Sequence, residues 1–145
     1  MTQTAFRIGG VLVAATMLAC GSDNSTEPGL ALAGTYSATQ WVTTGGTGQT
    51  NQLNAGSTLN ITLNSNGTTT GHLHVAASGG NPAFDADMAG TWAQSGNTVT
   101  FSQTADTFVR NMSFDVVPSG AKWALVGDHV FASSSTRVQL TLTQS

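Results

Sequence analysis

Two pairs of alternating side chains near the middle of the chain are of types that bind metal ions. His72 and His74 are one residue apart, so a strand would place both imidazoles on one face. That spacing can hold zinc or copper when a third ligand comes from elsewhere. Asp85 and Asp87 have the same spacing, but their segment lacks the further oxygen ligands of a dedicated calcium loop. We expect both pairs to be solvated polar residues, with His72 and His74 as weak metal candidates.

Hydrolytic and nucleotide-dependent catalysis have little support in the residue types. Asp128 and His129 are two members of a catalytic triad by type, but neighbouring residues on a strand point to opposite faces. The chain has no Gly-x-Ser-x-Gly elbow and no phosphate-binding glycine loop followed by Lys and Ser or Thr. We therefore expect neither an enzyme nor a cofactor.

The charge balance argues against nucleic acid as a partner. The chain has 4 Lys and Arg against 7 Asp and Glu, a net charge of −3 with neutral histidines, and only 8% of its residues are charged. Binding to nucleic acid requires clustered Lys and Arg that neutralise phosphates. Thr, Ser, Asn, Gln and Gly dominate instead, which is common in exported β-proteins with a neutral polar surface.

The first 20 residues are typical of an exported protein. Arg7 gives a positive start, and residues 8–19 form an uncharged, mostly apolar run of a signal peptide's length. The run is shorter than the roughly 20 apolar residues that span a bilayer. It ends in Met17-Leu18-Ala19-Cys20, which resembles the lipobox of bacterial lipoproteins, although Met17 and Leu18 depart from the usual residues there. The resemblance implies that Cys20 is lipidated, becomes the mature N-terminus and binds the chain to a membrane.

An ordinary secretory signal with a spare cysteine is the alternative. Cys20 is the only cysteine, so it has no disulfide partner in the chain, and an odd exposed thiol would be a liability unless it carried lipid. Gly21 follows it instead of Asp, which by resemblance to Gram-negative sorting rules favours the outer membrane of a cell with two membranes. We expect a signal peptide over residues 1–19, a lipidated cysteine and flexible tether over 20–29, and one domain over 30–145.

The domain has the pattern of an all-β protein. Leu59, Ile61 and Leu63 alternate with polar residues, and Ser95-Gly96-Asn97 supplies a tight turn within a central hairpin over residues 90–101. Two long loops are expected over residues 43–56 and 78–87, and a turn at residues 127–128. Further strands are expected over residues 30–42, 68–77, 108–117 and 121–126, with a last strand through residues 138–142.

Eight or nine strands joined mostly by short turns indicate an antiparallel up-and-down meander. Such a sheet buries its apolar face and loses its free edges by closing into a barrel, with a β-sandwich as the alternative. Gly34-Thr35-Tyr36 and Gly90-Thr91-Trp92, the second followed by residues 95–99, resemble the small lipocalin-like domains of many bacterial lipoproteins. The resemblance covers about residues 30–145 and implies a barrel whose mouth takes an apolar ligand.

The aromatic residues and one cation are the candidate ligand-binding set. Most aromatic side chains must be core, since an eight-stranded barrel is only just wide enough for its own side chains. Arg110 is expected on an apolar face, where it would need a rim position, an acidic partner such as Asp115 or Asp87, or an anionic ligand head group. The candidates are Trp92, Phe101, Phe108, Arg110, Phe114 and Trp123.

These observations support two hypotheses. The first is a lipid-anchored, non-enzymatic binding module of the cell envelope for a small apolar or amphipathic ligand. The second is a structural or protein-interaction module of the envelope with a filled barrel, which functions through its threonine-rich outer face and its two long loops. A large apolar cavity would favour the first hypothesis, and a close-packed interior would favour the second.

Overall fold

The computed structural model describes residues 32–145, in which most of the β-strands have alternating apolar and polar residues. The expected signal peptide, Cys20 and tether lie outside the described residues. The strands are β1 (Gly34–Gly45), β2 (Gly48–Asn51), β3 (Thr58–Leu63), β4 (Thr68–Val75), β5 (Phe84–Asp87), β6 (Gly90–Ser95), β7 (Thr98–Gln103), β8 (Ser113–Ser119), β9 (Lys122–Phe131) and β10 (Thr136–Gln144). One short 3₁₀ helix, η2 (Phe108–Asn111), precedes β8.

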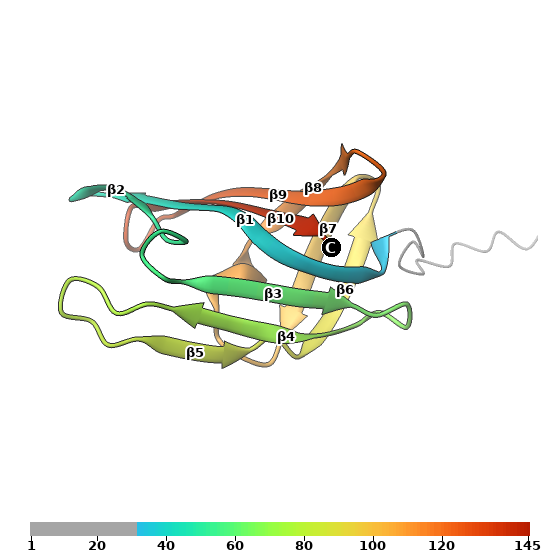
Figure 1. Ribbon diagram of the computed structural model, residues 1–145, viewed down its shortest axis with the longest axis horizontal. Coiled ribbons are helices and arrows are strands. Elements are labelled where there is room, and N and C mark those ends of the chain that lie inside the picture. The colour runs from blue at the N-terminus through green and yellow to red at the C-terminus, as the bar shows by residue number, and fades with distance from the viewer. Residues whose placement is uncertain (1–31) are drawn as a thin grey trace, which may run out of the picture.

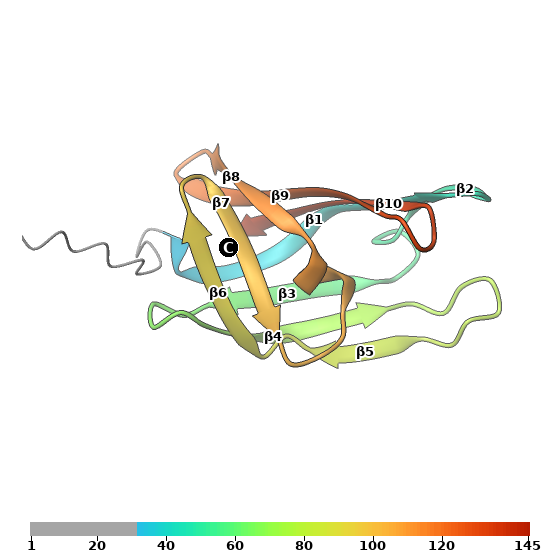
Figure 2. The same cartoon turned by 180° about the vertical axis from the view of Figure 1, so that it is seen from behind.

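The sheet closes into an antiparallel barrel (Figures 1 and 2). Around the barrel the strand order is β10-β9-β8-β7-β6-β4-β3-β1, and β10 also pairs with β1 from Tyr36↔Gln144 to Thr44↔Arg137. This closure confirms the all-β, barrel-forming meander and rules out the β-sandwich alternative. Two short strands lie outside the ring, since β2 pairs with β1 and β5 pairs with β4.

Inward-facing apolar side chains form one core. Leu59, Ile61 and Leu63 of β3 are all buried, as their alternation predicts. Tyr36 of β1 is fully buried, and its hydroxyl donates a hydrogen bond to the carbonyl oxygen of Leu32 at 2.8 Å. The phenol therefore contributes its apolar ring to the core while its polar atom is satisfied. No helix of residues 32–145 is long and apolar enough to cross a membrane.

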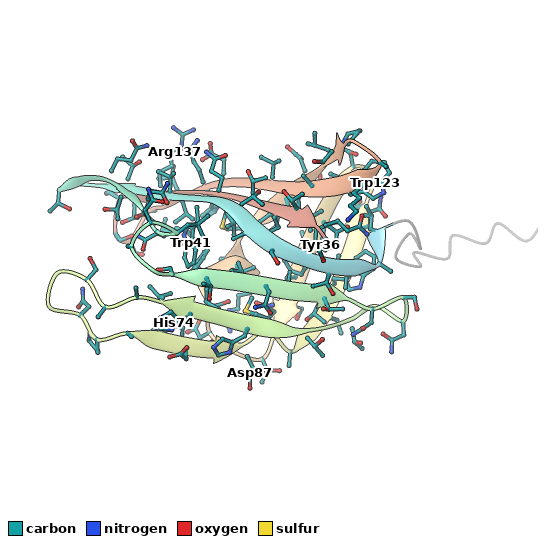
Figure 3. All side chains as sticks on the ribbon, viewed as in Figure 1. Tyr36, Trp41, His74, Asp87, Trp123 and Arg137 are labelled. Atoms are coloured by element: carbon teal, nitrogen blue, oxygen red, sulfur yellow. The ribbon has the colours of Figure 1, made fainter. Side chains whose placement is uncertain are left out.

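A β-bulge in β1 explains why its inward face is hard to read from the sequence. Tyr36 and Trp41 are five residues apart, so strict alternation would send them to opposite faces, yet both are buried (Figure 3). The pairing of β1 with β10 shifts by one residue between Ala38 and Gln40. The extra residue inverts the alternation, and both aromatic rings enter the core.

The two segments expected as long loops contain strands, so these expectations were wrong over residues 43–51 and 84–87, while residues 52–56 and 78–83 lie outside the strands. Residues 43–51 continue β1 to Gly45 and return as β2, with Val42↔Asn51 as the last pair of that hairpin. Residues 84–87 form β5, which pairs with β4 from Val75↔Phe84 to His72↔Asp87. Backbone groups of these polar segments find partners on a neighbouring strand, so regular pairing occurs without an apolar pattern in the side chains.

The turn expected at residues 127–128 is absent, because β9 runs unbroken through them. Gly127 lies on the inner face, where an added Cβ would come within 2.7 Å of Phe114 Cε1 and 2.8 Å of Met112 Cε. This glycine therefore makes room for two core side chains within a strand. The chain instead turns at residues 132–135, where Ser135 has a φ of 52°.

Candidate functional site

The two histidines and the two aspartates with alternating spacing meet on the outer face of β4 and β5. The strands are antiparallel, and their register places His72 opposite Asp87 and His74 opposite Asp85. Since side chains on a strand alternate with a period of two, both pairs fall on the same face. His74 and Asp87 are labelled in Figure 3. We call these four residues the His–Asp cluster.

Asp85 is the centre of the cluster. Its Oδ1 accepts hydrogen bonds from both rings, with His74 Nδ1 at 2.8 Å and His72 Nε2 at 3.0 Å. The other ring nitrogen of His72, Nδ1, faces Asp87 Oδ1 at 3.7 Å. The hydrogen bonds from His74 and His72 lower the pKa of Asp85, because they stabilise the carboxylate. The cluster thus holds an ionised carboxylate between two imidazoles at the protein surface.

Asp85 is hydrogen-bonded to both histidines of the cluster, and Asp87 lies 3.7 Å from His72. In their present positions, no three His, Cys, Asp or Glu side chains of residues 32–145 are placed to hold a metal ion. The spacing of the four residues was visible in the sequence, but their juxtaposition was missed because residues 78–87 were expected to form a loop. If residues 84–87 had been predicted as a strand paired with β4, the two pairs would have been expected side by side on one face of the sheet.

The third histidine lies away from this cluster. His129 is on the inner side of β9, where its ring makes an edge-to-face contact with Phe131 at a centroid distance of 4.5 Å. Asp128 is on the outer side and accepts a hydrogen bond from Arg137 Nε at 2.8 Å, with a second bond from Nη2 to its other oxygen. Hydrogen bonding to Arg137 lowers the pKa of Asp128. Asp128 is therefore one half of a surface ion pair, and the neighbouring imidazole points the other way.

Three of the aromatic residues expected at a ligand site are core residues. Trp92, Phe101 and Phe114 are 4%, 5% and 0% exposed. The rings of Phe101 and Phe114 pack edge to face with centroids 5.4 Å apart. Trp92 Nε1 donates a hydrogen bond to the carbonyl oxygen of Asn64 at 2.9 Å, so its polar atom is also satisfied. No pocket is found in the described part of the chain.

The remaining aromatic candidates lie at the edges of the core. Phe108 and Trp123 are partly buried against it. The ring of Phe108 packs on Trp41 with centroids 5.3 Å apart. Trp123 is on β9 and is labelled in Figure 3, far from Trp41 along the barrel. The six candidates therefore do not form one cluster around a shared cavity.

Arg110 is on the surface, contrary to the expectation that it shares an apolar face. The segment that was expected to be a strand begins as η2, and the helical turn sends Val109 into the core instead. Arg110 Nη2 pairs with Asp106 Oδ1 at 2.9 Å. Its partner is therefore Asp106, neither Asp115 nor Asp87, and the guanidinium needs no ligand to neutralise it.

Two buried polar atoms near η2 were not anticipated. Among the described residues, Trp41 Nε1 and Gln103 Nε2 are buried without a hydrogen-bond partner. Gln103 is close to the start of η2, because its Oε1 accepts a hydrogen bond from the Thr107 hydroxyl at 3.2 Å. Gln103 is two residues after Phe101 and four after Val99, so it lies on the same inward face of β7. This spacing is the sequence signal that would have identified Gln103 as a buried polar residue.

Comparison with known proteins gives no further assignment. No family model matches the chain, and neither the curated proteins nor the solved structures contain a match. The function is therefore argued from the residues and their arrangement.

Proposed function

We propose that the chain is a lipid-anchored module of the cell envelope that functions through its outer surface, with a barrel filled by its own side chains. The observation that carries this proposal is the packing of the interior. Tyr36, Phe114 and Leu125, from three different strands, are all fully buried. A barrel of eight strands has an interior just wide enough to be filled in this way. The surface is then what remains for recognition.

The start of the described chain, which the proposed anchor precedes, and the two added hairpins lie at opposite ends of the barrel, which suggests how the molecule is placed relative to a membrane. Leu32, the first described residue, precedes β1 at one end of the barrel. The β1–β2 hairpin and the connection between β4 and β5 extend beyond the other end (Figures 1 and 2). A lipid on Cys20 would therefore attach the chain to a membrane on the side of the first end, and the two extensions lie at the opposite end of the barrel.

The outer face is polar and largely uncharged. Threonine hydroxyls pair across strands, as with Thr35 and Thr62 at 2.9 Å and Thr39 and Thr143 at 2.8 Å. All four residues of β2 are exposed, and Phe84 of β5 is 46% exposed. Such a surface supports binding to a protein of the envelope through hydrogen bonds and small apolar contacts. Over residues 32–145 this face carries no cluster of Lys and Arg that could bind nucleic acid.

A second candidate function is binding of a small amphipathic ligand at the barrel end where Trp41 packs on Phe108. The observation that favours it is the pair of unpaired N–H donors on Trp41 and Gln103, since a buried donor without a partner is costly. A ligand carbonyl or carboxylate that reached these donors would satisfy them. Binding there requires Phe108 to move, because no pocket exists in residues 32–145 as described.

A ligand titration separates the two candidates. The full chain is titrated with a fatty acid and, separately, with a lysophospholipid, while tryptophan fluorescence and the unfolding temperature are recorded. The filled barrel predicts no saturable response below the concentration at which these lipids form micelles. A saturable response that disappears in Trp41→Phe but persists in Trp123→Phe would contradict the filled barrel and establish the second candidate.

The anchor is tested by Cys20→Ser. The variant is expected to leave the membrane fraction and to keep the circular dichroism spectrum of the parent, because residue 20 precedes the barrel. Ser22→Ala is the matched control and should stay with the membrane. Unchanged partitioning of Cys20→Ser would contradict lipid anchoring at this residue.

A further inference from the structure

We infer that His72, His74 and Asp85 form a binding site for Zn²⁺, or for a divalent ion with the same preference for imidazole, on the outer face of β4 and β5. The site is independent of the proposed function, since it uses neither the anchor nor the barrel interior. Two imidazoles and one carboxylate are a ligand set that zinc accepts, with water in the fourth position.

The hydrogen-bonded geometry is close to the geometry of a metal site. Tetrahedral zinc with bonds of about 2.0 to 2.1 Å holds its ligand atoms about 3.3 Å apart. Asp85 Oδ1 lies 2.8 Å from His74 Nδ1 and 3.0 Å from His72 Nε2. Each of these ring nitrogens therefore needs to move away from the carboxylate oxygen by only a few tenths of an ångström. Their side chains are 56%, 35% and 47% exposed, which leaves them free to make that adjustment.

The cluster also has a second carboxylate, that of Asp87, on the side of the His72 ring that would face away from the metal. With Nε2 of His72 directed at the metal, its Nδ1 faces Asp87 Oδ1 at 3.7 Å, a distance that must shorten before the two atoms form a hydrogen bond. A carboxylate behind a ligating imidazole fixes the ring orientation and makes the ligand more basic. His74 would bind through Nδ1, so the two rings would use different nitrogen atoms.

The local charge favours a dication. Within residues 32–145, the ion-pair partners of Asp85 and Asp87 are the two histidines and no Lys or Arg. With neutral imidazoles the cluster therefore holds two carboxylates that no fixed cation neutralises. β5 is only four residues long and pairs with β4 alone. A metal bound by His72, His74 and Asp85 would join the two strands by side chains as well as by backbone.

The binding test uses the full chain with Cys20→Ser, which removes the single thiol, and without a polyhistidine tag. Zn²⁺ is titrated in competition with a chromogenic chelator. We expect one ion per chain, and we expect His74→Asn or Asp85→Asn to weaken binding at least about tenfold. The matched controls His129→Asn and Asp115→Asn should bind as the parent does. Circular dichroism of each variant confirms that the barrel is intact.

Nitrogen-15 spectra of the histidine rings identify the ligand atoms. Zn²⁺ is expected to shift Nε2 of His72 and Nδ1 of His74, and to leave both nitrogens of His129 unchanged. Asp87→Asn should weaken binding less than Asp85→Asn, because Asp87 lies behind a ligand. No binding would overturn the inference, and so would equal affinity in all variants, which is adventitious binding. A shift at the opposite ring nitrogens would overturn the geometry.

Discussion

Trp92 should contribute more to stability than any outward residue of the central hairpin. A buried tryptophan removes about 150 to 250 Å² from water, which at about 25 cal/mol per Å² is roughly 4 to 6 kcal/mol before residual burial in the unfolded chain is subtracted. The side chain is 4% exposed, so nearly all of this area is lost to Trp92→Ala. The variant should therefore be destabilised by about 3 to 5 kcal/mol.

A second substitution at Trp92 separates the contribution of the buried ring to stability from the contribution of its hydrogen bond. Trp92 Nε1 donates to the carbonyl oxygen of Asn64, a residue of the β3–β4 turn, at 2.9 Å. Trp92→Phe keeps most of the apolar area and removes this one hydrogen bond, at a cost of about 0.5 to 1.5 kcal/mol, because the oxygen still accepts a hydrogen bond from the backbone N–H of Gly67 at 3.0 Å. Thr100→Ala is the matched control, since Thr100 is exposed on the adjacent strand β7 and should change stability by less than about 0.5 kcal/mol.

Urea unfolding, followed by circular dichroism, gives the free energies for the three variants. The order of loss should be Trp92→Ala, then Trp92→Phe, then Thr100→Ala. Nearly equal small losses for Trp92→Ala and Thr100→Ala would refute the reasoning, because they would place Trp92 outside the core.

Two further predictions concern the barrel interior. Burial raises the pKa of Tyr36, the only tyrosine, to about 12, so its ultraviolet titration should be delayed relative to unfolded chain. Because the folded pKa exceeds the unfolded value, the contribution of Tyr36 to stability should be fully present below about pH 10 and should fall by about 2 to 3 kcal/mol as the pH rises to about 12; a midpoint near 10 in the folded protein would contradict this. Gly127→Ala should cost about 1 to 3 kcal/mol in urea unfolding, since its Cβ would meet Phe114 at 2.7 Å. Gly46→Ala, where an added Cβ has open space, is its control, and equal effects of the two would contradict the packing role.

The sequence predicted those strands whose inner face is apolar throughout. Leu59, Ile61 and Leu63 of β3, and Val138, Leu140 and Leu142 of β10, are buried as their alternation requires. In such segments the need to bury one face determines both that a strand forms and which of its residues point inward. The closure of β10 on β1 agrees with the barrel expected from the sequence, because closure buries the apolar face of a meander and removes its free edges.

The expectations failed where backbone pairing or a bulge decided the structure. β2 and β5 carry no buried core residue, so their sequences lack the alternating apolar pattern that predicts a strand. Backbone hydrogen bonds to a neighbouring strand stabilise them instead. In β1 the bulge reverses the phase between Tyr36 and Trp41. Gly127 was interpreted as a turn residue, although its role is to admit Phe114, a distant contact that local sequence does not contain.

The candidate site was predictable in composition but not in assembly. The spacing of His72 and His74 placed both rings on one outward face, and the structure confirms this. The carboxylates that face them are supplied by the register of β4 with β5. The position of Arg110 was not predictable in this way. A helical turn forms where the sequence predicted a strand, and it places Arg110 on the surface, where the side chain pairs with Asp106.

The central proposal is tested most directly by the intact mass of the protein purified from its own cells under native conditions. A lipid-anchored filled barrel predicts a chain that begins at Cys20, carries an acyl modification there, and retains no small molecule after gentle ionisation. A chain that begins elsewhere or lacks acyl mass would contradict the anchor. A stoichiometric small molecule released on denaturation would contradict the filled barrel.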